Sequence, residues 1–404
     1  MRILIISQYP IHPAVHGGQK RTSAIVSYYK QKNDVKHCAV YWPGMYQEPV
    51  RADDSYHFIV ASEYLINQLR LHPERSDLLL GRSLSGRSKL GQRLRDLIVT
   101  FKPDMIHVEQ PYLILPLRSI LNGIDYTAVI VHGSQNVEHS LKRDIYNKIL
   151  PKNDFNYLIE STTRVERLAI KQSDINIGVS RADIGALRQY IGQIWLVAGN
   201  GTDAISKVQS ITDKGDLDST LVFVGSAHPP NYMGVESLLK DTRFLVDKSR
   251  LLLIGGVAEY FQSKYSESDP FWLGKVFVGK VDDKELKRYI QHSDIIVLPI
   301  ETGGGSNLKT AEAIGAHKRI IGTSFAFRGY EDYKGLPNVF IANTAEEFKD
   351  TILQALAMEL QPYTDAQLRL VNRLRWRCAL RSLTVAIFYT RIILFVKRIR
   401  RHVT

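Results

Sequence analysis

The sequence predicts an α/β protein built of two doubly wound domains, and three observations favour this fold class. The chain has 404 residues, which is about two to three times the length of a typical domain. Short runs rich in Val, Ile and Leu alternate with longer helical patterns along the chain, as in sheets whose parallel strands are connected by helices. These runs show little polar alternation, which indicates strands that are covered by helices on both faces.

The predicted strands form two sets of about six, one set in each half of the chain. The first half contains RILIISQ, KHCAVYW, MIHVEQ, AVIVHG, INIGVS and IWLVA. The second half contains STLVFVGS, RLLLIGG, VFVGKV, DIIVLPI, RIIGTS and NVFIAN. Because each set is interleaved with helical patterns, we expect two separate parallel sheets whose ligands bind beyond the carboxyl ends of the strands.

We predict four segments along the chain. Residues 1–197 form the first domain, and residues 220–365 form the second. Between them, residues 198–219 are rich in Gly, Asp and Ser and lack a periodic apolar face, which is typical of a linker. Residues 366–404 form a basic helical segment at the C-terminus.

Composition limits the classes of function. Hydrophobic residues make up 44% of the chain and charged residues 23%, as in a globular protein with real cores. Two distant cysteines, Cys38 and Cys378, argue against a disulfide framework and indicate a reducing compartment. The start of the chain, MRILIISQYP, predicts a strand and not a signal peptide, so we expect a cytoplasmic protein.

The net charge of +12 is concentrated near the C-terminus. A basic balance suits nucleic acid, anionic lipid or a phosphorylated small ligand. We expect no nucleic-acid partner, because the sequence has no zinc-finger spacing, no RNP-type aromatic pattern and no helix-turn-helix.

The stretch ETGGGSNLKTAEAIG, residues 301–315, follows the apolar run DIIVLPI and leads into an Ala-rich helical pattern. Its glycines permit positive φ and let backbone N–H groups approach a ligand, and Ser306 or Asn307 is a suitable cap for the helix. A helix N-terminus with Lys309 in its first turn predicts a site for phosphate, most simply a diphosphate. Glu312, one turn further along, is placed to accept hydrogen bonds from ribose-like hydroxyls. The alternative is a glycine-rich turn with a solvated Lys and Glu.

Several stretches of the chain resemble GT-B glycosyltransferases, particularly the large retaining group called family 4. VFVGKVDDKELKRYIQHSDIIVLPIETGGGSNLKTAEAIGAHKRIIGTSFAFRGYED is similar to their nucleotide-sugar half. Other stretches resemble parts of the first domain, the interdomain signal and the first unit of the second domain: RILIISQYPIHPAVHGGQKRT, KPDMIHVEQPYL, AVIVHGSQNVEH, SDINIGVSRAD, VAGNGTD and LVFVGSAHPPNYMGVESLL. The resemblance extends over most of the chain. It implies two Rossmann-like domains facing a cleft, and the transfer of a sugar from a nucleoside-diphosphate sugar.

The sequence departs from the family in its charged residues. The family carries two glutamates separated by seven residues on the glycine-rich loop; the second matches Glu312, and the first falls on Gly304. Glu301 is a displaced substitute. The family also tends to hold the donor phosphates with an Arg and a Lys after the first strand of the second domain, where this chain has GSAHPPNYMG. Lys309 and Arg328 are the candidates to replace that charge.

The resemblance and the glycine pattern together give the residues that we expect to bind the donor. They are Gly17, Gly18, Gly225, Ser226, Asn231, Gly279, Val281, Glu301, Gly303, Gly304, Gly305, Ser306, Asn307, Leu308, Lys309 and Glu312. For Gly17 and Gly18 the alternative is an ordinary strand-to-helix turn. Lys20 and Arg21, which follow them, are candidates to attract an anionic acceptor lipid or to form a solvated helix start.

The catalytic candidates are His132, Glu138, Glu109 and Lys309. By the resemblance, His132 corresponds to the family's N-domain histidine, which contacts the donor sugar near the reacting carbon. The alternative is a structural histidine at a strand end whose hydrogen bonds are satisfied within the fold. Glu138 lies in NVE, an element of some family members, and is a candidate for the acceptor side. Glu109 ends a strand, and a carboxylate at the rim is an equal alternative. We expect no cofactor and no metal, because no His, Asp or Glu set has metal-ligand spacing.

The basic C-terminal segment has two compatible interpretations. Arg377, Arg381, Thr384, Arg391 and Arg398 fall near one helical stripe, which is interrupted by Phe388 and Phe395. The resemblance implies a final helix that packs onto the first domain. The helix is also suited to lie on an anionic membrane, which would place the enzyme peripherally at the inner face.

We therefore expect a glycosyltransferase, with a glycan or lipid-linked acceptor in cell-surface polysaccharide or glycoconjugate synthesis. Two other functions fit the same fold. One is a nucleotide-sugar epimerase, which needs no acceptor. The other is a GT-B scaffold with impaired catalysis, which the missing glutamate and the missing Arg and Lys make a real alternative.

Overall fold

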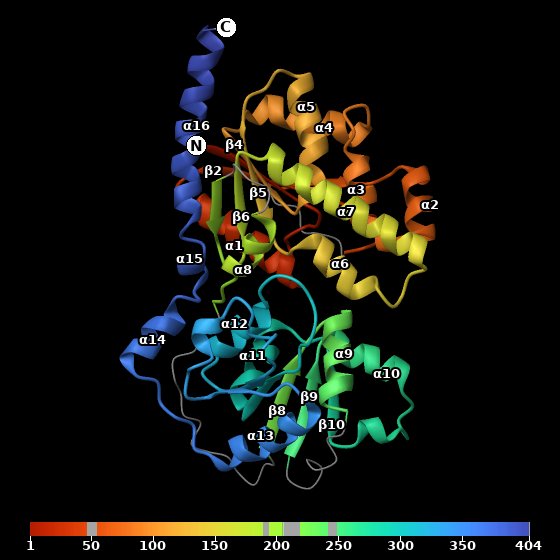
Figure 1. The fold of residues 1–404 in the computed structure, drawn as a ribbon, viewed down its shortest axis with the longest axis vertical. Helices are drawn as coiled ribbons and strands as arrows, with labels where there is room; N and C mark the ends of the chain where they lie inside the picture. The colour runs from red at the N-terminus through yellow and green to blue at the C-terminus, as the bar shows by residue number, and fades with distance from the viewer. Residues whose placement is uncertain (47–54, 189–193, 204, 206–218, 241–248, 404) are drawn as a thin grey trace. The chain divides into compact units, whose positions relative to one another are not determined.

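The computed structural model describes residues 1–46, 55–188, 194–203, 205, 219–240 and 249–403 (Figure 1). The chain divides into two compact units. The first unit contains Met1–Gly199 and Ala379–Thr404, and the second contains Asn200–Cys378. Most of the predicted linker, residues 198–219, lies outside the described residues.

The first unit is built around a parallel sheet of seven strands in the order β3-β2-β1-β4-β5-β6-β7. Its strands are β1 (Arg2–Ser7), β2 (Asp34–Tyr41), β3 (Ser55–Ile59), β4 (Met105–Glu109), β5 (Val129–Ser134), β6 (Ile175–Gly178) and β7 (Ile194–Val197). Central strands such as β1 are almost entirely apolar because helices cover both of their faces.

The helices of this unit pack on the two faces of the sheet. They are α1 (Gly17–Lys30), α2 (Glu63–Leu71), α3 (Ser76–Ser83), α4 (Lys89–Phe101), α5 (Ile114–Gly123), α6 (Glu138–Tyr146), α7 (Lys152–Gln172), α8 (Arg181–Leu187) and α16 (Leu383–Val403). Ile106 and Val108 of β4 share a core with α3, α4 and α5. On the other face of β4, Met105 accepts a hydrogen bond from Thr390 of α16, and His107 meets Tyr29 of α1.

The second unit has a parallel sheet of six strands in the order β10-β9-β8-β11-β12-β13. Its strands are β8 (Ser219–Val224), β9 (Ser249–Ile254), β10 (Lys275–Gly279), β11 (Ile295–Leu298), β12 (Arg319–Gly322) and β13 (Val339–Ile341). Its helices are α9 (Pro229–Leu238), α10 (Gly256–Lys264), α11 (Asp283–His292), α12 (Leu308–Gly315), α13 (Ala345–Ala357) and α14 (Asp365–Asn372). A short helix, α15 (Trp376–Ala379), follows at the unit boundary.

The structure confirms the predicted fold class, since both sheets have the strand order of doubly wound, Rossmann-like domains. Both cysteines are free thiols, as predicted. One strand, β3, was not predicted. It is a partly exposed edge strand, and its sequence SYHFI contains polar residues that interrupt the apolar pattern used to recognise strands. The predicted stripe from Arg377 to Arg398 is also divided, because α15 ends at Ala379 and α16 begins at Leu383.

Candidate functional site

The glycine-rich loop connects β11 to α12, as the sequence predicts. Gly303 and Gly305 have φ angles of 125° and 57°, in the region that favours glycine. Asn307 caps α12, and its side chain accepts a hydrogen bond from the backbone N–H of Lys309 at 3.3 Å. The glycines therefore give this loop a path that other residues would strain.

Two side chains fix the direction of the loop's peptide groups. Arg328 Nη2 donates to the carbonyl oxygen of Gly304 at 2.5 Å, and Asn200 Nδ2 donates to that of Ser306 at 2.9 Å. In a trans peptide the N–H points opposite to the C=O. The N–H groups of Gly305 and Asn307 consequently point away from these two side chains. Arg328, a candidate for phosphate charge, contacts the loop itself.

Two polar groups of the loop are buried without a partner. Ser306 Oγ and Asn307 Nδ2 have no hydrogen-bond partner within the described part of the chain, and Ser306 is only 7% exposed. Leaving a buried polar group unsatisfied costs about 1–3 kcal/mol. Such groups are normally satisfied by water or by a ligand, so this loop has the properties of a binding site for polar oxygen atoms.

The ends of β8, β9 and β10 pack closely beside one another. A Cβ on Gly255 would lie 2.6 Å from the carbonyl oxygen of Gly225, and the Gly255 N–H donates to Gly279 at 2.6 Å. Asn231 Nδ2 donates to the Ser226 carbonyl oxygen at 2.9 Å. The predicted donor-binding residues Gly225, Ser226, Asn231 and Gly279 are therefore brought to one edge of the sheet.

The glycine-rich loop reaches the same edge. A Cβ on Gly303 would lie 3.5 Å from Pro230 Cγ, at the start of α9. Lys309 and Glu312 are half-buried on α12, and their spacing of three places them on one side of the helix. Glu301 is exposed just after β11, and Val281 packs partly buried after β10.

In the first unit, Glu109 lies at the centre of a buried polar group that we call the Glu109 cluster: Glu109, Arg21, His107, Gln135 and Tyr9. Gln135 Nε2 donates to Glu109 Oε2 at 2.6 Å, and His107 Nε2 lies 2.9 Å from Glu109 Oε1. Burial alone would raise the pKa of Glu109, but Arg21, His107 and Gln135 outweigh it and lower the pKa to about 2. Glu109 is therefore an ionised, buried carboxylate and not a rim group.

The position of Arg21 corrects the interpretation of the first helix. Its side chain is neither solvated nor available to a lipid: it is 1% exposed, and its Nε lies 3.4 Å from Glu109 Oε2. Its Nη1 donates to the Ala198 carbonyl oxygen at 2.9 Å. Gly18 packs against the same cluster, because a Cβ there would lie 2.9 Å from the Tyr9 hydroxyl.

His132 does not join Glu109. In the register of β4 with β5, His132 pairs with Val108, so its side chain lies on the opposite face of the sheet from that of Glu109. His132 Nδ1 lies 3.0 Å from Asn176 Oδ1, and burial lowers the pKa of the imidazole. Because Asn176 Nδ2 donates elsewhere, we assign the proton to His132 Nδ1, which leaves Nε2 as an acceptor. This buried Nε2 has no partner among the residues that the structure describes.

Glu138 begins α6 and lies in a second buried group, the Glu138 cluster: Glu138, Tyr112, Asn136, Glu166 and His139. Tyr112 and Asn136 donate to its two carboxylate oxygens at 3.0 and 3.1 Å. Glu166 Oε1 accepts from the Glu138 N–H at 2.7 Å, and its Oε2 lies 2.5 Å from His139 Nδ1. Burial, with the nearby Asp77 carboxylate, raises the pKa of Glu138 to about 7, so the group titrates near neutral pH.

The sequence analysis missed Glu166 and placed Arg21 at the surface, although the helical pattern around both residues indicates burial. Each is a charged residue at a position where its amphipathic helix turns an apolar side inward. Glu166 follows Leu158 and Thr162 at intervals of four, and all three are buried. A charge within a buried stripe indicates a buried partner.

The raised pKa of Glu138 predicts a specific pH dependence of stability. Its folded pKa of about 7 exceeds the ordinary value of 4.5, so the folded state keeps a proton that the unfolded chain releases. Stability is therefore lost as pH rises from about 4.5 to about 7, by about 3 kcal/mol at most. Gln carries no charge, so its stability does not change with pH in this range. The Tm of Glu138→Gln minus the Tm of wild type should therefore increase by several degrees from pH 5 to pH 8 in thermal melts.

The comparison between the two pH values removes any constant effect of exchanging an oxygen for an amide. The control is Glu160→Gln, which alters an exposed glutamate of α7. A Tm difference for Glu138→Gln that is the same at both pH values would contradict a raised pKa.

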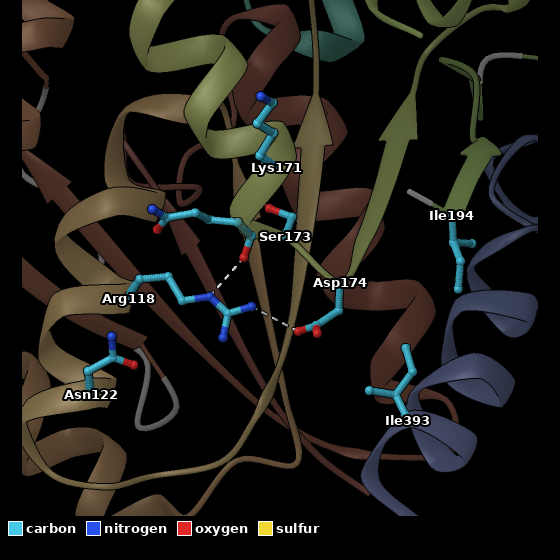
Figure 2. A pocket seen from close by; sticks show the side chains of 8 residues that line it. Arg118, Asn122, Lys171, Ser173, Asp174, Ile194 and Ile393 are labelled. Carbon is cyan, nitrogen blue, oxygen red and sulfur yellow. Dashed lines mark hydrogen bonds and ion pairs between the residues drawn. The ribbon is translucent and has the colours of Figure 1, made fainter. Parts of the chain in front are cut away.

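The predicted site residues do not lie in the polar cavity of about 630 Å³ in Figure 2. This cavity is lined by Arg118, Asp174 and Ile194, among others. Asp174 directly precedes β6 and Ile194 begins β7, so the cavity lies at the amino ends of these strands. In the described ranges of the chain, no group of three or more His, Cys, Asp or Glu side chains is arranged to hold a metal ion.

A family model described as "Glycosyl transferases group 1" matches residues 218–358. This range extends from β8 to α13 and includes the glycine-rich loop. No match to a curated protein was found.

Several solved structures are similar to this chain over nearly its whole length. Sucrose-phosphate synthase from Thermosynechococcus elongatus has a TM-score of 0.70 at 14% identity, covering 97% of this chain and 99% of that one. HepE from Anabaena in complex with UDP-glucose has a TM-score of 0.67 at 12% identity, covering 96% and 100%. The lipopolysaccharide outer core galactosyltransferase WaaB in its apo form has a TM-score of 0.62 at 13% identity, covering 96% and 99%.

Identities this low carry information about fold and not about substrates. The family match, by contrast, rests on sequence and falls on the unit that contains the glycine-rich loop. The chain therefore has the two-unit fold of GT-B glycosyltransferases, and its second unit matches glycosyl transferases group 1 over residues 218–358.

Proposed function

We propose that this protein is a glycosyltransferase that moves a sugar from a nucleoside-diphosphate sugar to a hydroxyl of a glycan or lipid-linked acceptor. The observation that carries the proposal is the loop from Gly303 to Asn307. It combines directed peptide N–H groups, two buried polar groups without partners and a capped helix N-terminus. The family match includes this loop. The products would belong to cell-surface polysaccharide or glycoconjugate synthesis. The similar protein WaaB is a galactosyltransferase of the lipopolysaccharide outer core.

The donor's diphosphate is proposed to bind at this loop. The N-terminus of α12 and the ammonium of Lys309 supply positive charge where the leaving group gains negative charge, without proton transfer. Ser306 Oγ and Asn307 Nδ2 offer hydrogen bonds to the phosphate oxygens. Glu312, on the same side of α12 as Lys309, accepts hydrogen bonds from the ribose hydroxyls. UDP-glucose is the first donor to test, because the similar protein HepE was solved with it.

The first unit is proposed to hold the sugar and the acceptor. Neutral His132 accepts a hydrogen bond from a sugar hydroxyl at Nε2, since its Nδ1 proton is directed to Asn176. Glu138 orients the acceptor hydroxyl, and a pKa of about 7 suits it to exchange a proton near neutral pH. Glu109 keeps Arg21 and Gln135 in place and does not touch substrate. We further propose a hexosyl donor, retention of the anomeric configuration and no metal requirement.

The experiment is a thermal-shift screen of the full chain with nucleosides, nucleoside diphosphates and their sugars. A bound diphosphate at a hundred times its Kd stabilises the folded state by about 2.7 kcal/mol, so Tm should rise by several degrees. The nucleosides alone should produce little change. If Glu312 binds ribose, UDP should stabilise the protein more than 2′-deoxy-UDP does. Equal shifts for nucleoside and diphosphate would contradict the assignment of the loop.

Radiolabelled donor separates the competing functions. Label that moves from the nucleotide sugar into glycan or lipid extracts supports transfer. Label that stays on free nucleotide sugar of altered stereochemistry favours an epimerase. If calorimetry detects no binding of any nucleoside-diphosphate sugar, the protein is a scaffold on this fold.

A further inference from the structure

Helix α16 carries an apolar stripe that is exposed along most of its length. The exposed fractions are 41% for Val385, 59% for Phe388, 43% for Ile392, 66% for Phe395, 40% for Val396 and 48% for Ile399. At 3.6 residues per turn these positions fall within roughly 100° of the helix circumference. Scattered apolar side chains are normal on a surface, but a continuous stripe of this kind marks an interaction surface.

The opposite side of α16 is fixed to the first unit. Leu383 and Ala386 are buried, and Thr390 Oγ1 lies 3.3 Å from Met105 Sδ of β4. Lys397 Nζ forms an ion pair with Asp174 at 2.8 Å. Ile393, between these contacts, lines the cavity in Figure 2. The helix is therefore held lengthwise against the unit, with its apolar stripe turned outward.

The charged side chains of the C-terminal segment that carries the stripe are all positive. The sequence has no Asp or Glu from residue 366 to residue 404. Arg391 and Arg398 are exposed and lie on one flank of the stripe, and Arg381 is exposed just before the helix. A surface that binds here must accept apolar side chains and complement arginine. Anionic lipid headgroups above acyl chains have both properties.

We propose that α16 docks this protein on the surface of an anionic bilayer, such as a cytoplasmic leaflet, with the stripe inserted at the headgroup level. The stretch Trp376–Ile399 is long and apolar enough to cross a membrane by length and composition. Crossing would remove Thr390 and Lys397 from their partners in the first unit. A second copy, paired face to face, would bring arginines of like charge together. The docking is independent of glycosyl transfer.

The test is sedimentation of the full chain with sucrose-loaded vesicles. Wild type should bind vesicles of 70% phosphatidylcholine and 30% phosphatidylglycerol much more strongly than vesicles of phosphatidylcholine alone. Phe388→Asn with Phe395→Asn should lower the partition coefficient by about tenfold or more, because two large apolar side chains no longer insert. Arg391→Gln with Arg398→Gln should lower it about fivefold for each charge, and added salt should reduce that difference.

The matched control is Tyr64→Asn with Leu71→Asn, which alters two apolar side chains of α2 that are each 69% exposed. It should bind vesicles like wild type. Unchanged Tm values establish that all variants fold. The proposal is overturned if wild type stays in the supernatant, or if the phenylalanine variant binds like wild type. It is also overturned if protein made in cells resists alkaline extraction, which indicates a spanning helix, or if the stripe instead holds a dimer in sedimentation velocity.

Discussion

Replacing Lys309 with alanine should weaken the binding of a nucleoside diphosphate, and slow transfer from its sugar, by a hundredfold or more. The ammonium in the first turn of α12 adds a full charge to the partial charge of the helix N-terminus. Removing one such contact to a developing anion typically costs about 2–4 kcal/mol. Calorimetry with UDP, and kcat/KM with the donor found in the screen, measure the two effects.

The binding of uridine alone should change little in this variant, because the nucleoside carries no phosphate. Lys284→Ala is the matched control, since Lys284 is an exposed lysine on α11 of the same unit. Equal losses for UDP and uridine would show that Lys309 supports the structure of the loop and does not bind the diphosphate.

Glu109→Gln should destabilise the first unit by about 3–5 kcal/mol, because it leaves the buried guanidinium of Arg21 without its carboxylate. Urea unfolding at pH 7 measures the loss. The folded pKa of Glu109, about 2, lies below its ordinary value, so the carboxylate contributes stability above pH 4.5 that is lost as pH falls towards 2. The gap between variant and wild type should therefore narrow below about pH 4.5.

A double variant distinguishes the loss of the ion pair from a change in side-chain packing. Arg21→Met combined with Glu109→Gln removes both charges and should be more stable than Glu109→Gln alone. Glu63→Gln, at an exposed position of α2, should leave stability unchanged. A loss below about 1 kcal/mol for Glu109→Gln, the size of an exposed pair, would contradict the buried ion pair.

Most of the fold could be predicted from the sequence, because buried parallel strands consist of runs of apolar residues. β1 and β11 are runs of Ile, Leu and Val, and the loop after β11 carries its own glycines and its cap. β3 left no such signal, since an edge strand is covered on fewer sides and tolerates Ser, Tyr and His.

The site was predictable only in part, for a geometric reason. The ends of the predicted strands indicate which residues lie at the carboxyl edge of the sheet, where ligands bind. They do not indicate on which face of the sheet each side chain lies. His132 and Glu109 were therefore grouped together, although the register of β4 and β5 separates them. The helical pattern of α1 indicates that Arg21 is buried, but it does not identify its partner Glu109, which lies far away in the sequence.

The boundary between the units has a consequence for how the chain is made. The first unit is interrupted: Met1–Gly199 precedes the second unit, and Ala379–Thr404 follows it. During synthesis, residues 1–199 of the first unit leave the ribosome before the second unit, and α16 follows only after the second unit has been synthesised. Until then, the side of β4 that α16 covers is bare. A nascent chain halted near residue 199 should therefore need a chaperone, whereas a continuous piece from 200 to 378 contains everything its own sheet requires.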